Sequence, residues 1–596
     1  MEERLPPPPP PNRDRKKKKS VVLPLLLFFV TFILLLGVIG IILVVSALRS
    51  PKAISAPRNS VLRIQLSGEL PEYVPPSGLA VLTGKKPFFF YDYLALIEKA
   101  KNDPKIAGIY LEIYPLSAGY AQMSELRHAL QDFQAADKFV TVYGEMWSES
   151  EYYLASVGDD VFMTPESMLM LDGFMSRISF YQEALAWAGI KVDVAAFKEY
   201  KSFADSYRYA EMTDAHREST TALLSEINQN FIKDVASSRE IAEEKVSDAL
   251  TNGTYDAETA FTAGLIDGVQ YRDQVEASIA KKLNTDVKNL HLIEFYRYFI
   301  PNHGQPGGTN QVAVLLANGT INSGTADRGA FGDSVVGSDW FVDQVRSIRE
   351  DDRIKAVVVR IDSPGGSGLA SDVMWRELKN LEADGIPLVA SMGNVAASGG
   401  YYLAMGCPTI FCEPMTITGS IGVVAMRIDM ADFYNNIKVN VQVLKTGPNA
   451  DFFDPYRPLT DEERNAFLQR TGQFYQAFVE KAAESRNKAF DDFEPLAHGR
   501  VWSGSAALQN GLVDRQGGLM DAVRFAAQSA GLSRYSVRLF PGEKDFWALL
   551  QDSQVEAKND PVIDQVLPPL AKRLVDLNVA KQPQPLAVLP FDIEIQ

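Results

Sequence analysis

Cysteine and histidine are both scarce in this chain of 596 residues, which has two cysteines and five histidines. Cys407 and Cys412 lie close together but lack a CxxC spacing, so neither a disulfide framework nor a zinc site is indicated. The histidines are scattered and form no HExxH or other metal-ligand pair: His128, His216, His291, His303 and His498. We therefore expect a protein that needs no metal and no other cofactor.

The chain also lacks an excess of positive charge. Its net charge is -16, although a basic cluster occupies residues 13–19, so the remainder is more acidic still. This balance argues against nucleic acid as a partner. With 22% charged and 46% hydrophobic residues the chain is typical of globular proteins. Its length exceeds that of one ordinary core, so two or more domains are expected.

Charge is absent altogether from residues 21–48, which are mostly Leu, Val, Ile and Phe. This run exceeds the roughly 20 residues that span a bilayer. It is also longer than the apolar core of a signal peptide, about 7–15 residues, and no clear A-x-A cleavage site closes it. We predict an uncleaved, single-pass transmembrane anchor at residues 21–48, preceded by a disordered, proline-rich basic tail at residues 1–20. The positive-inside rule then places the tail in the cytoplasm and the following domains on the other side of the inner (cytoplasmic) membrane, which in a Gram-negative bacterium is the periplasm.

After the anchor, strand-like and helix-like segments alternate, which predicts an α/β fold with largely buried strands. Strands are expected at residues 61–66, 106–113 and 139–142, and helices at residues 91–100 and 123–135. A stretch rich in Gly, Pro and Asn, residues 301–310, is typical of a linker. After this linker the strand pattern restarts, at residues 312–316 and 354–361.

The strand pattern restarts because the sequence contains an internal repeat. YYLA at residues 401–404 repeats YYLA at residues 152–155 at an offset of 249 (401 − 152). GLVD at residues 511–514 echoes GLID at residues 264–267 at an offset of 247 (511 − 264). Matches in one order at nearly constant offset indicate two tandem copies of one domain. The predicted organisation has copies at residues 55–300 and 311–540, the linker between them, and an extension at residues 541–596 without a counterpart.

Ser398 is a candidate nucleophile because it stands among small residues, in the sequence AASGGYY at residues 396–402. A hydrophobic run at residues 387–390 precedes it and a helix-compatible segment at residues 401–405 follows. This order predicts a strand, a tight turn and a helix start. The free N–H groups of a helix N-terminus would lie close to the hydroxyl and could stabilise an oxyanion. A turn that serves only packing is the alternative.

The two copies differ in complementary ways around this serine. Ser398 corresponds to Glu149 in the first copy, and the Gly365–Gly366 pair, whose N–H groups could hold a bound carbonyl, has no counterpart there. Conversely, Lys201 of the first copy falls on Pro448 of the second. A buried lysine with a lowered pKa can act as a general base. Such reciprocal loss is expected of a site that is shared between two copies.

Other residues remain alternatives for the base. His303 lies in the linker and His498 in a predicted turn, and either could be an ordinary loop histidine. Lys201 itself could be a surface lysine, as most lysines are. Lys198 has a counterpart in Lys445, so a surface role suits it better. Tyr114 and Asp362, at the predicted strand ends, receive no role.

The order of motifs resembles the long, tandem-domain form of bacterial signal peptide peptidase A, peptidase family S49, in the Clp/crotonase superfamily. The matching pieces are the N-terminal anchor, YKS at residues 200–202, SPGGS at 363–367, AASGGYY at 396–402, TGSIGV at 418–423 and GRVWSG at 499–504. The resemblance covers roughly residues 55 to 535.

The resemblance implies two Clp/crotonase-like domains and a Ser/Lys protease, with Ser398 as nucleophile and Lys201 as general base. It implies that Ser420 orients the lysine, although a plain turn serine is the alternative. It further implies oxyanion donors in the N–H groups of Gly399 and of Gly365 or Gly366, and a homotetramer.

Three functions are compatible with these features. The first is a membrane-anchored serine endopeptidase that degrades cleaved signal peptides and other short apolar peptides. The second is an acyl-CoA enzyme of the crotonase type, which would use acidic catalytic residues and needs no anchor. The third is a non-catalytic membrane scaffold, whose second-copy site would be degraded. The intact AASGG sequence and the reciprocal loss favour the peptidase. Whether Ser398 and Lys201 meet within one chain or between chains stays open.

Overall fold

The computed structural model describes most of the chain beyond the predicted anchor. The described residues are 31–32, 35–37, 39–40, 54–73, 88–299, 309–325, 334–541 and 586–588. The tail at residues 1–20, most of the predicted anchor and linker, and most of the C-terminal extension therefore lie outside them. Among the residues described, no helix combines the length and apolarity needed to cross a membrane. The chain divides into two compact units, residues 1–52 with 76–86 and residues 53–75 with 87–596. Everything below concerns the second unit.

The first copy is built on a parallel sheet in the order β4-β3-β2-β1, with β6 and β8 at its edges. Its elements are β1 (Ser60–Glu69), α3 (Phe90–Asn102), β2 (Ile106–Ser117), α4 (Tyr120–Gln134), β3 (Phe139–Trp147), α5 (Glu149–Ala155), β4 (Asp160–Leu171), α6 (Gln182–Ala188), β5 (Lys191–Ala196), the 3₁₀ turn η1 (Ser202–Ala204), α7 (Asp205–Arg208), α8 (Asp214–Arg239), α9 (Glu243–Asn252), β6 (Gly253–Asp256), α10 (Ala257–Thr262), β7 (Gly268–Val269), α11 (Arg272–Lys282), η2 (Val287–Asn289), β8 (Leu292–Glu294) and α12 (Phe295–Tyr298).

The second copy repeats this plan with the parallel order β14-β12-β9-β20. Its elements, with one strand of the extension, are β9 (Gln311–Asn318), β10 (Thr320–Asn322), β11 (Val335–Gly337), α13 (Ser338–Glu350), β12 (Ile354–Ser363), β13 (Gly365–Ser367), α14 (Gly368–Ala383), β14 (Leu388–Ala397), α15 (Gly399–Ala404), β15 (Thr409–Cys412), β16 (Ile417–Gly419), β17 (Val424–Asp429), α16 (Ala431–Asn436), α17 (Asp461–Ser485), α18 (Phe490–Phe493), η3 (Glu494–Leu496), β18 (Val501–Ser503), α19 (Gly504–Asn510), β19 (Arg515–Gln516), α20 (Leu519–Ser529), β20 (Ser536–Phe540) and β21 (Leu586–Val588).

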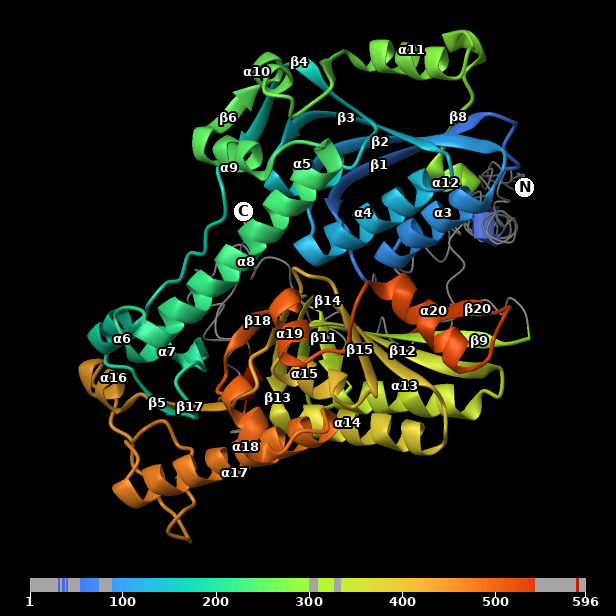
Figure 1. Cartoon of the computed structure of the whole chain (residues 1–596). Coiled ribbons are helices and arrows are strands. Elements are labelled where there is room, and N and C mark those ends of the chain that lie inside the picture. Colours follow the sequence, from blue (N-terminus) through green and yellow to red (C-terminus); the bar gives the residue numbers. More distant parts are fainter. Residues whose placement is uncertain are drawn as a thin grey trace, which may run out of the picture. The chain divides into compact units, whose positions relative to one another are not determined.

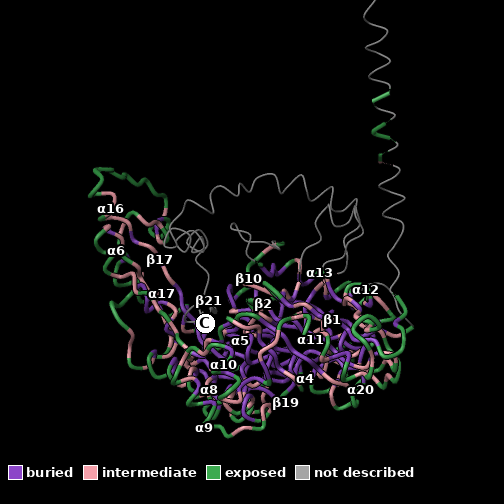
Figure 2. The backbone as a smooth tube through the Cα atoms, turned by 90° about the horizontal axis from the view of Figure 1, so that it is seen from above, coloured by how far each residue is buried: buried purple, intermediate pink, exposed green. Residues whose placement is uncertain are grey.

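The predicted α/β fold with two tandem domains is confirmed. The central strands β2 and β12 are mostly apolar and largely buried, as strands covered on both faces require. Figure 2 shows that the buried residues are concentrated in the part of the molecule that contains the two sheets, whereas the segment around α16 is exposed.

Equivalent hydrogen bonds recur in the two copies. The hydroxyl of Tyr152 donates to the carbonyl oxygen of Leu265 at 2.7 Å, and that of Tyr401 donates to the carbonyl oxygen of Leu512 at 2.8 Å. Each copy also has one Arg–Asp ion pair of 2.7 Å at matching positions, namely Arg239–Asp267 and Arg486–Asp514. The sequence repeat is therefore a repeat of three-dimensional contacts.

A third sheet joins the copies, and the sequence did not reveal it. Strand β5 of the first copy pairs antiparallel with β17 of the second over six residue pairs, from Val424↔Ala196 to Asp429↔Lys191. In Figure 1 the long helix α8 runs from the sheet of the first copy to helices α6 and α7, next to β5 and β17. The first copy thus sends an arm, α6 to α8, onto the second.

A buried ion cluster also connects the copies. The guanidinium of Arg360, on β12, lies 2.6 Å from a carboxylate oxygen of Glu72 and 2.7 Å from one of Glu125, both in the first copy. All three side chains are buried. Removing one partner of such a cluster leaves a buried charge uncompensated, which costs about 3–5 kcal/mol. The cluster therefore fixes the position of β12 relative to α4.

Candidate functional site

Ser398 is a one-residue turn between β14 and α15. Strand β14 continues to Ala397 and the helix begins at Gly399. The strand is thus longer than the predicted run at residues 387–390, and the turn is tighter than expected. Ser398 has φ 56° and ψ -111°, a backbone conformation that is uncommon for a residue other than glycine. Such strain persists only where the surroundings enforce it, and it marks functional sites often.

Strand β16 enforces this conformation. The N–H of Ser398 donates to the carbonyl oxygen of Gly419 at 2.8 Å, and the hydroxyl of Thr418 donates to the carbonyl oxygen of Ala396 at 2.7 Å. Ala397 and Gly419 are paired in the sheet. Because its own N–H is engaged in the sheet, Ser398 has only its hydroxyl to offer to a ligand.

The side chains of Lys201, Ser398 and Ser420, which were predicted from the sequence, lie together within one chain. The Nζ of Lys201 lies 2.7 Å from Oγ of Ser398, 2.9 Å from Oγ of Ser420 and 2.9 Å from the carbonyl oxygen of Ser420. Lys201 is 2% exposed, and the two serines have no exposed surface. Burial lowers the pKa of Lys201 well below its ordinary value, because a low-dielectric environment disfavours the ammonium. An amine of this kind can be neutral at a pH where an ordinary lysine is charged.

The position of Lys201 depends on both copies. It follows β5, which β17 of the second copy holds, and the N–H of the preceding Tyr200 donates to the carbonyl oxygen of His498 at 3.2 Å. Two glycines of the second copy leave room for the lysine stem. A Cβ at Gly499 would lie 2.6 Å from Cβ of Lys201, and a Cβ at Gly422 would lie 3.2 Å from its Cδ.

The glycines predicted as oxyanion donors also lie together. A Cβ at Gly399 would stand 3.1 Å from Cα of Gly365 and 3.1 Å from N of Gly366. Gly366 has φ 155°, and a Cβ there would meet the carbonyl oxygen of Ile321 at 2.0 Å. The N–H of Gly365 donates to the hydroxyl of Ser363 at 3.2 Å. The start of α15 and the Gly-Gly turn after β12 are therefore in contact, as a shared oxyanion site requires.

His498 and Lys198, which the sequence offered as other candidates near the base, contact acidic side chains. The ring nitrogens of His498 lie 3.1 Å from a carboxylate oxygen of Glu199 and 2.7 Å from one of Glu494. Lys198 forms an ion pair with Glu494 at 2.7 Å. His303 lies outside the described residues. The side-chain hydroxyl of Ser398 is hydrogen-bonded to Lys201, whereas His498 and Lys198 contact Glu199 and Glu494.

Asp362, for which the sequence suggested no role, supports the serine strand. Its carboxylate accepts a hydrogen bond of 2.9 Å from the N–H of Val395, three residues before Ser398. It is half-buried, and its partial removal from water, followed by the charge of Glu72, raises its pKa to about 6. Tyr114, the other unassigned residue, lies in the first copy, 3.4 Å from Arg272. The sequence feature that could have indicated the role of Asp362 is its position at the end of a strand, directly before SPGG.

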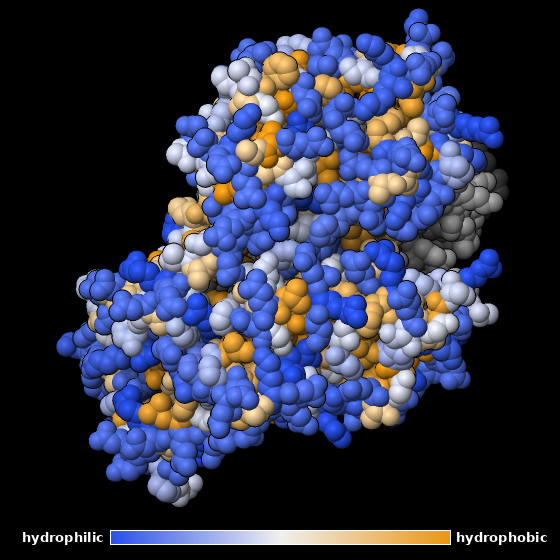
Figure 3. Space-filling model, in the orientation of Figure 1, coloured by the Kyte–Doolittle hydropathy of each residue, from blue (hydrophilic) through white to orange (hydrophobic). Residues whose placement is uncertain are grey.

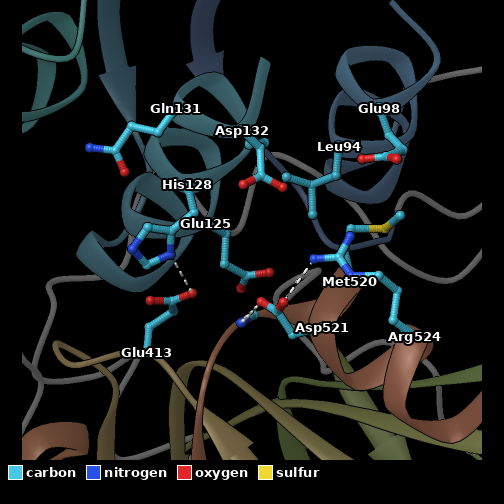
Figure 4. A pocket seen from close by; sticks show the side chains of 12 residues that line it. Leu94, Glu98, Glu125, His128, Gln131, Asp132, Glu413, Met520, Asp521 and Arg524 are labelled. Carbon is cyan, nitrogen blue, oxygen red and sulfur yellow. Dashed lines mark hydrogen bonds and ion pairs between the residues drawn. The ribbon is translucent and has the colours of Figure 1, made fainter. Parts of the chain in front are cut away.

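A polar pocket of about 240 Å³ lies where α3 and α4 of the first copy face α20 and Glu413 of the second (Figure 4). His128 points down to Glu413 at 3.3 Å, and this hydrogen bond raises the pKa of His128. Burial raises the pKa of the neighbouring Glu125 to about 8. The residues that line the pocket include no serine, threonine, cysteine or lysine. It therefore offers titratable groups but no hydroxyl, thiol or lysine amine, unlike the site at Ser398.

Comparison with known proteins gives consistent matches. The profile of peptidase family S49 matches twice, at residues 132–286 and 380–533. The chain is 34% identical to the chloroplastic serine protease SPPA of Arabidopsis thaliana over 80% of this chain and 70% of that protein. It is 31% identical to protease 4 of Salmonella typhi, over 80% of this chain and 78% of that protein. With protease 4 of Haemophilus influenzae the identity is 27%, over 82% of each chain. The two profile matches fall on the two copies of the repeat.

Proposed function

The chain belongs to peptidase family S49 and is a serine protease, and we propose that Ser398 is its nucleophile and Lys201 its general base. The observation that carries this proposal is the 2.7 Å separation of Lys201 Nζ and Ser398 Oγ in a buried environment. A general base must lie within hydrogen-bond reach of the proton that it takes, and its pKa must lie near the working pH. Burial lowers the pKa of Lys201 well below its ordinary value, which is the direction that the second condition requires.

The reaction begins when the neutral amine of Lys201 takes the proton of Ser398 and Oγ attacks a peptide carbonyl carbon. The N–H groups of Gly399 and Gly366 stabilise the oxyanion, and Gly366 is preferred over Gly365 because the N–H of Gly365 already donates to Ser363. The lysine ammonium then protonates the leaving amine. Water, with Lys201 again as the base, releases the acyl group. The two oxygen atoms of Ser420 hold the amine in place throughout.

The proposed substrates are cleaved signal peptides and other short apolar peptides. A transmembrane anchor at residues 21–48 would keep the enzyme on the inner membrane, with its domains on the periplasmic side, where such peptides remain after secretion. The apolar, charge-free composition of that run supports the anchor. No metal or cofactor takes part in this mechanism.

We further propose that the chain assembles into a homotetramer. Support comes from exposed apolar side chains on α6 and after α16, which we call the α6–α16 patch: Trp187, Ile437, Val439, Val441, Val443 and Leu444. Leu444 is fully exposed and Trp187 is 89% exposed. Exposed apolar patches of this kind mark interaction surfaces. Apolar residues reach the surface near α16 and α17 between hydrophilic ones in Figure 3.

The assignment of the dyad is tested by kinetics on an apolar fluorogenic peptide. We expect Ser398→Ala to lower kcat/KM by about 10⁴-fold or more and Lys201→Met by about 10²–10⁴-fold. Lys198→Met is the matched control, because it removes a lysine of the same segment that pairs with Glu494. It should keep near-normal activity. Circular dichroism should show that all three variants are folded.

The pH profile gives a second, independent readout. Since only the neutral amine can take a proton, wild-type kcat/KM should rise with pH through the pKa of Lys201 and then level off. The plateau should begin well below pH 10.5, because burial lowers this pKa. If Lys201→Met retained more than about a tenth of wild-type kcat/KM, or kept the rising limb, Lys201 would not be the base.

A further inference from the structure

Strand β14 is irregular just before the turn that carries the nucleophile. Its pairing with β12 is regular as far as Ile361↔Met392, and the next pair is Ser363↔Ala396. A single residue of β12 therefore faces three residues of β14, residues 393–395. A bulge of this kind bends a strand and re-aims the residues that follow it. The direction in which β14 enters the serine turn thus depends on what holds the bulge.

Asp362 and Asn394 hold the bulge. One carboxylate oxygen of Asp362 accepts a hydrogen bond of 2.9 Å from the N–H of Val395, and the other lies 3.5 Å from the amide nitrogen of Asn394. The amide oxygen of Asn394 accepts a hydrogen bond of 3.1 Å from the N–H of Gln122, in the first copy. Both contacts agree with this orientation of the amide, since an ionised carboxylate cannot donate and an N–H cannot accept. Asn394 therefore joins the bulge to the first copy.

The hydrogen bond to Gln122 is a helix cap that the other copy supplies. Helix α4 has Gly119 as its N-cap residue, which has no side chain that could cap it. Gln122 is the third residue of the helix, and its N–H is one of those that lack a partner within a helix. Gly119 also leaves room for the amide, because a Cβ there would lie 2.2 Å from Cγ and from Oδ1 of Asn394. This space lets β14 contact α4 (Figure 1).

The residues that precede the bulge are bound to the buried ion cluster between the copies. The guanidinium of Arg360 donates to the hydroxyl of Ser391 and to the carbonyl oxygen of Met392, both at 3.1 Å. The same guanidinium pairs with Glu72 and Glu125 of the first copy. The part of β14 that leads into the serine turn is therefore connected to the first copy at two points.

We propose that Asn394 is a positioning residue for the reaction at Ser398, through which the docking of α4 sets the geometry of the serine turn. This inference rests on the proposed function and adds that the first copy orients the nucleophile as well as supplying Lys201. In the first copy, where Glu149 stands in place of the serine, the counterpart of Asn394 is the exposed Glu145 (394 − 249). Of the two copies, the one with the nucleophile has the amide.

The experiment is a double-mutant cycle between the copies, measured on the full chain with the apolar fluorogenic peptide. Gly119→Ala displaces the amide of Asn394 and causes no backbone strain, because Gly119 has φ -78°. We expect it to lower kcat about tenfold or more and to change KM less than about twofold, and Asn394→Ala should do the same. The double variant should resemble Asn394→Ala alone, because the added methyl group then has no amide to displace.

Gly447→Ala is the matched control, because a Cβ there meets nothing within 4 Å and the backbone has no positive φ. It should keep the wild-type kcat. A conservative exchange gives a further readout. Asn394→Asp sets two carboxylates side by side and should lower kcat, whereas Asp362→Asn/Asn394→Asp reverses the hydrogen bond between the two side chains and should recover most of the loss.

Hydrogen exchange separates this inference from the assignment of the dyad. The amides of residues 395–400 should exchange faster in Gly119→Ala than in the wild type or in Gly447→Ala, and Gly119→Ala should add nothing in the Asn394→Ala background. This readout needs no catalysis, so it decides the question if no chain hydrolyses the peptide. Where the chains are active, a kcat of Gly119→Ala equal to that of Gly447→Ala, or a loss that is the same with and without Asn394, would overturn the inference and leave the protease assignment intact.

Discussion

Two glycines of the second copy determine where the lysine amine can lie. Gly499 has φ 79° and adjoins the backbone and Cβ of Lys201, while Gly422 adjoins its stem. Positive φ suits glycine, and alanine there costs about 1 kcal/mol in strain alone. The decisive contact is with Lys201, which a Cβ at Gly499 would meet at 2.6 Å from N and from Cβ.

Gly499→Ala should therefore impair catalysis by moving Lys201, the proposed base. A displacement of about 1 Å at a catalytic group can lower the rate about 10²-fold, and we expect a loss of that order in kcat with a small change in KM. Gly511→Ala is the control, because Gly511 has φ 74° but its Cβ would meet only the end of the Lys488 side chain, at 3.3 Å. Both variants carry the strain of a positive φ, and Gly499→Ala should lose more thermal stability because its Cβ also displaces Lys201, so kcat is compared at a temperature at which both variants are folded. Equal kcat in the two variants would show that Gly499 does not position Lys201.

The sequence predicted the side chains of the candidate site, but it did not predict the residues that hold those side chains in position. Ser398 and Lys201 could be predicted because each copy lacks what the other keeps, and Ser420 followed from a resemblance. The role of Gly499 could not, although it lies in the GRVWSG motif. A glycine that accommodates a side chain 298 positions away in the sequence (499 − 201) leaves no local pattern, since the contact exists only after the copies have packed.

At the scale of elements, the strand pair β5–β17 brings the two halves of the site together. The sequence predicted neither strand, because each is short and each finds its partner in the other copy. The strands of the two parallel sheets were predictable, since their buried apolar runs are local signals. An antiparallel contact between segments of different copies is not a local signal, and the third sheet was therefore missed.

A disulfide across this pair would test the contact. Ala195 and Ala425 are opposite each other in the register, and Cα atoms of such pairs lie about 4.5–5.5 Å apart, within the range of disulfides. We expect the double variant Ala195→Cys/Ala425→Cys to form a bond within one chain upon mild oxidation, seen as faster migration in non-reducing electrophoresis, with activity kept within about twofold. The natural Cys407 and Cys412 are buried, and burial raises the pKa of both thiols, so they should stay reduced.

Ala195→Cys alone is the control for this experiment and should show no shift. A covalent dimer from the double variant would mean that β5 pairs with β17 of a second chain. Lys201 would then serve the serine of a neighbour, and the contact within one chain would be wrong.

At the scale of the whole molecule, the two side chains of the proposed dyad meet within one chain, so assembly is a separate property. The α6–α16 patch is formed by the arm of the first copy and by the segment that follows α16, which adjoin where the N–H of Phe433 donates to the carbonyl oxygen of Gly189. Residues 438–444, KVNVQVL, alternate polar and apolar residues without a strand partner in the described structure. Segments of this pattern readily pair with another chain.

Charge placed on this patch should block assembly without unfolding the chain. Because Val443 and Leu444 are 46% and 100% exposed, Val443→Asp/Leu444→Asp removes little buried surface. We expect light scattering in detergent to give a homotetramer for the wild type and a monomer for this variant. The control Val287→Asp/Tyr296→Asp changes two comparably exposed apolar residues, 47% and 56%, of the first copy and should stay assembled. If the patch variant kept the wild-type mass, this surface would not be the interface. Since Lys201 and Ser398 meet within one chain, the dissociated variant should still react with a serine-directed fluorophosphonate.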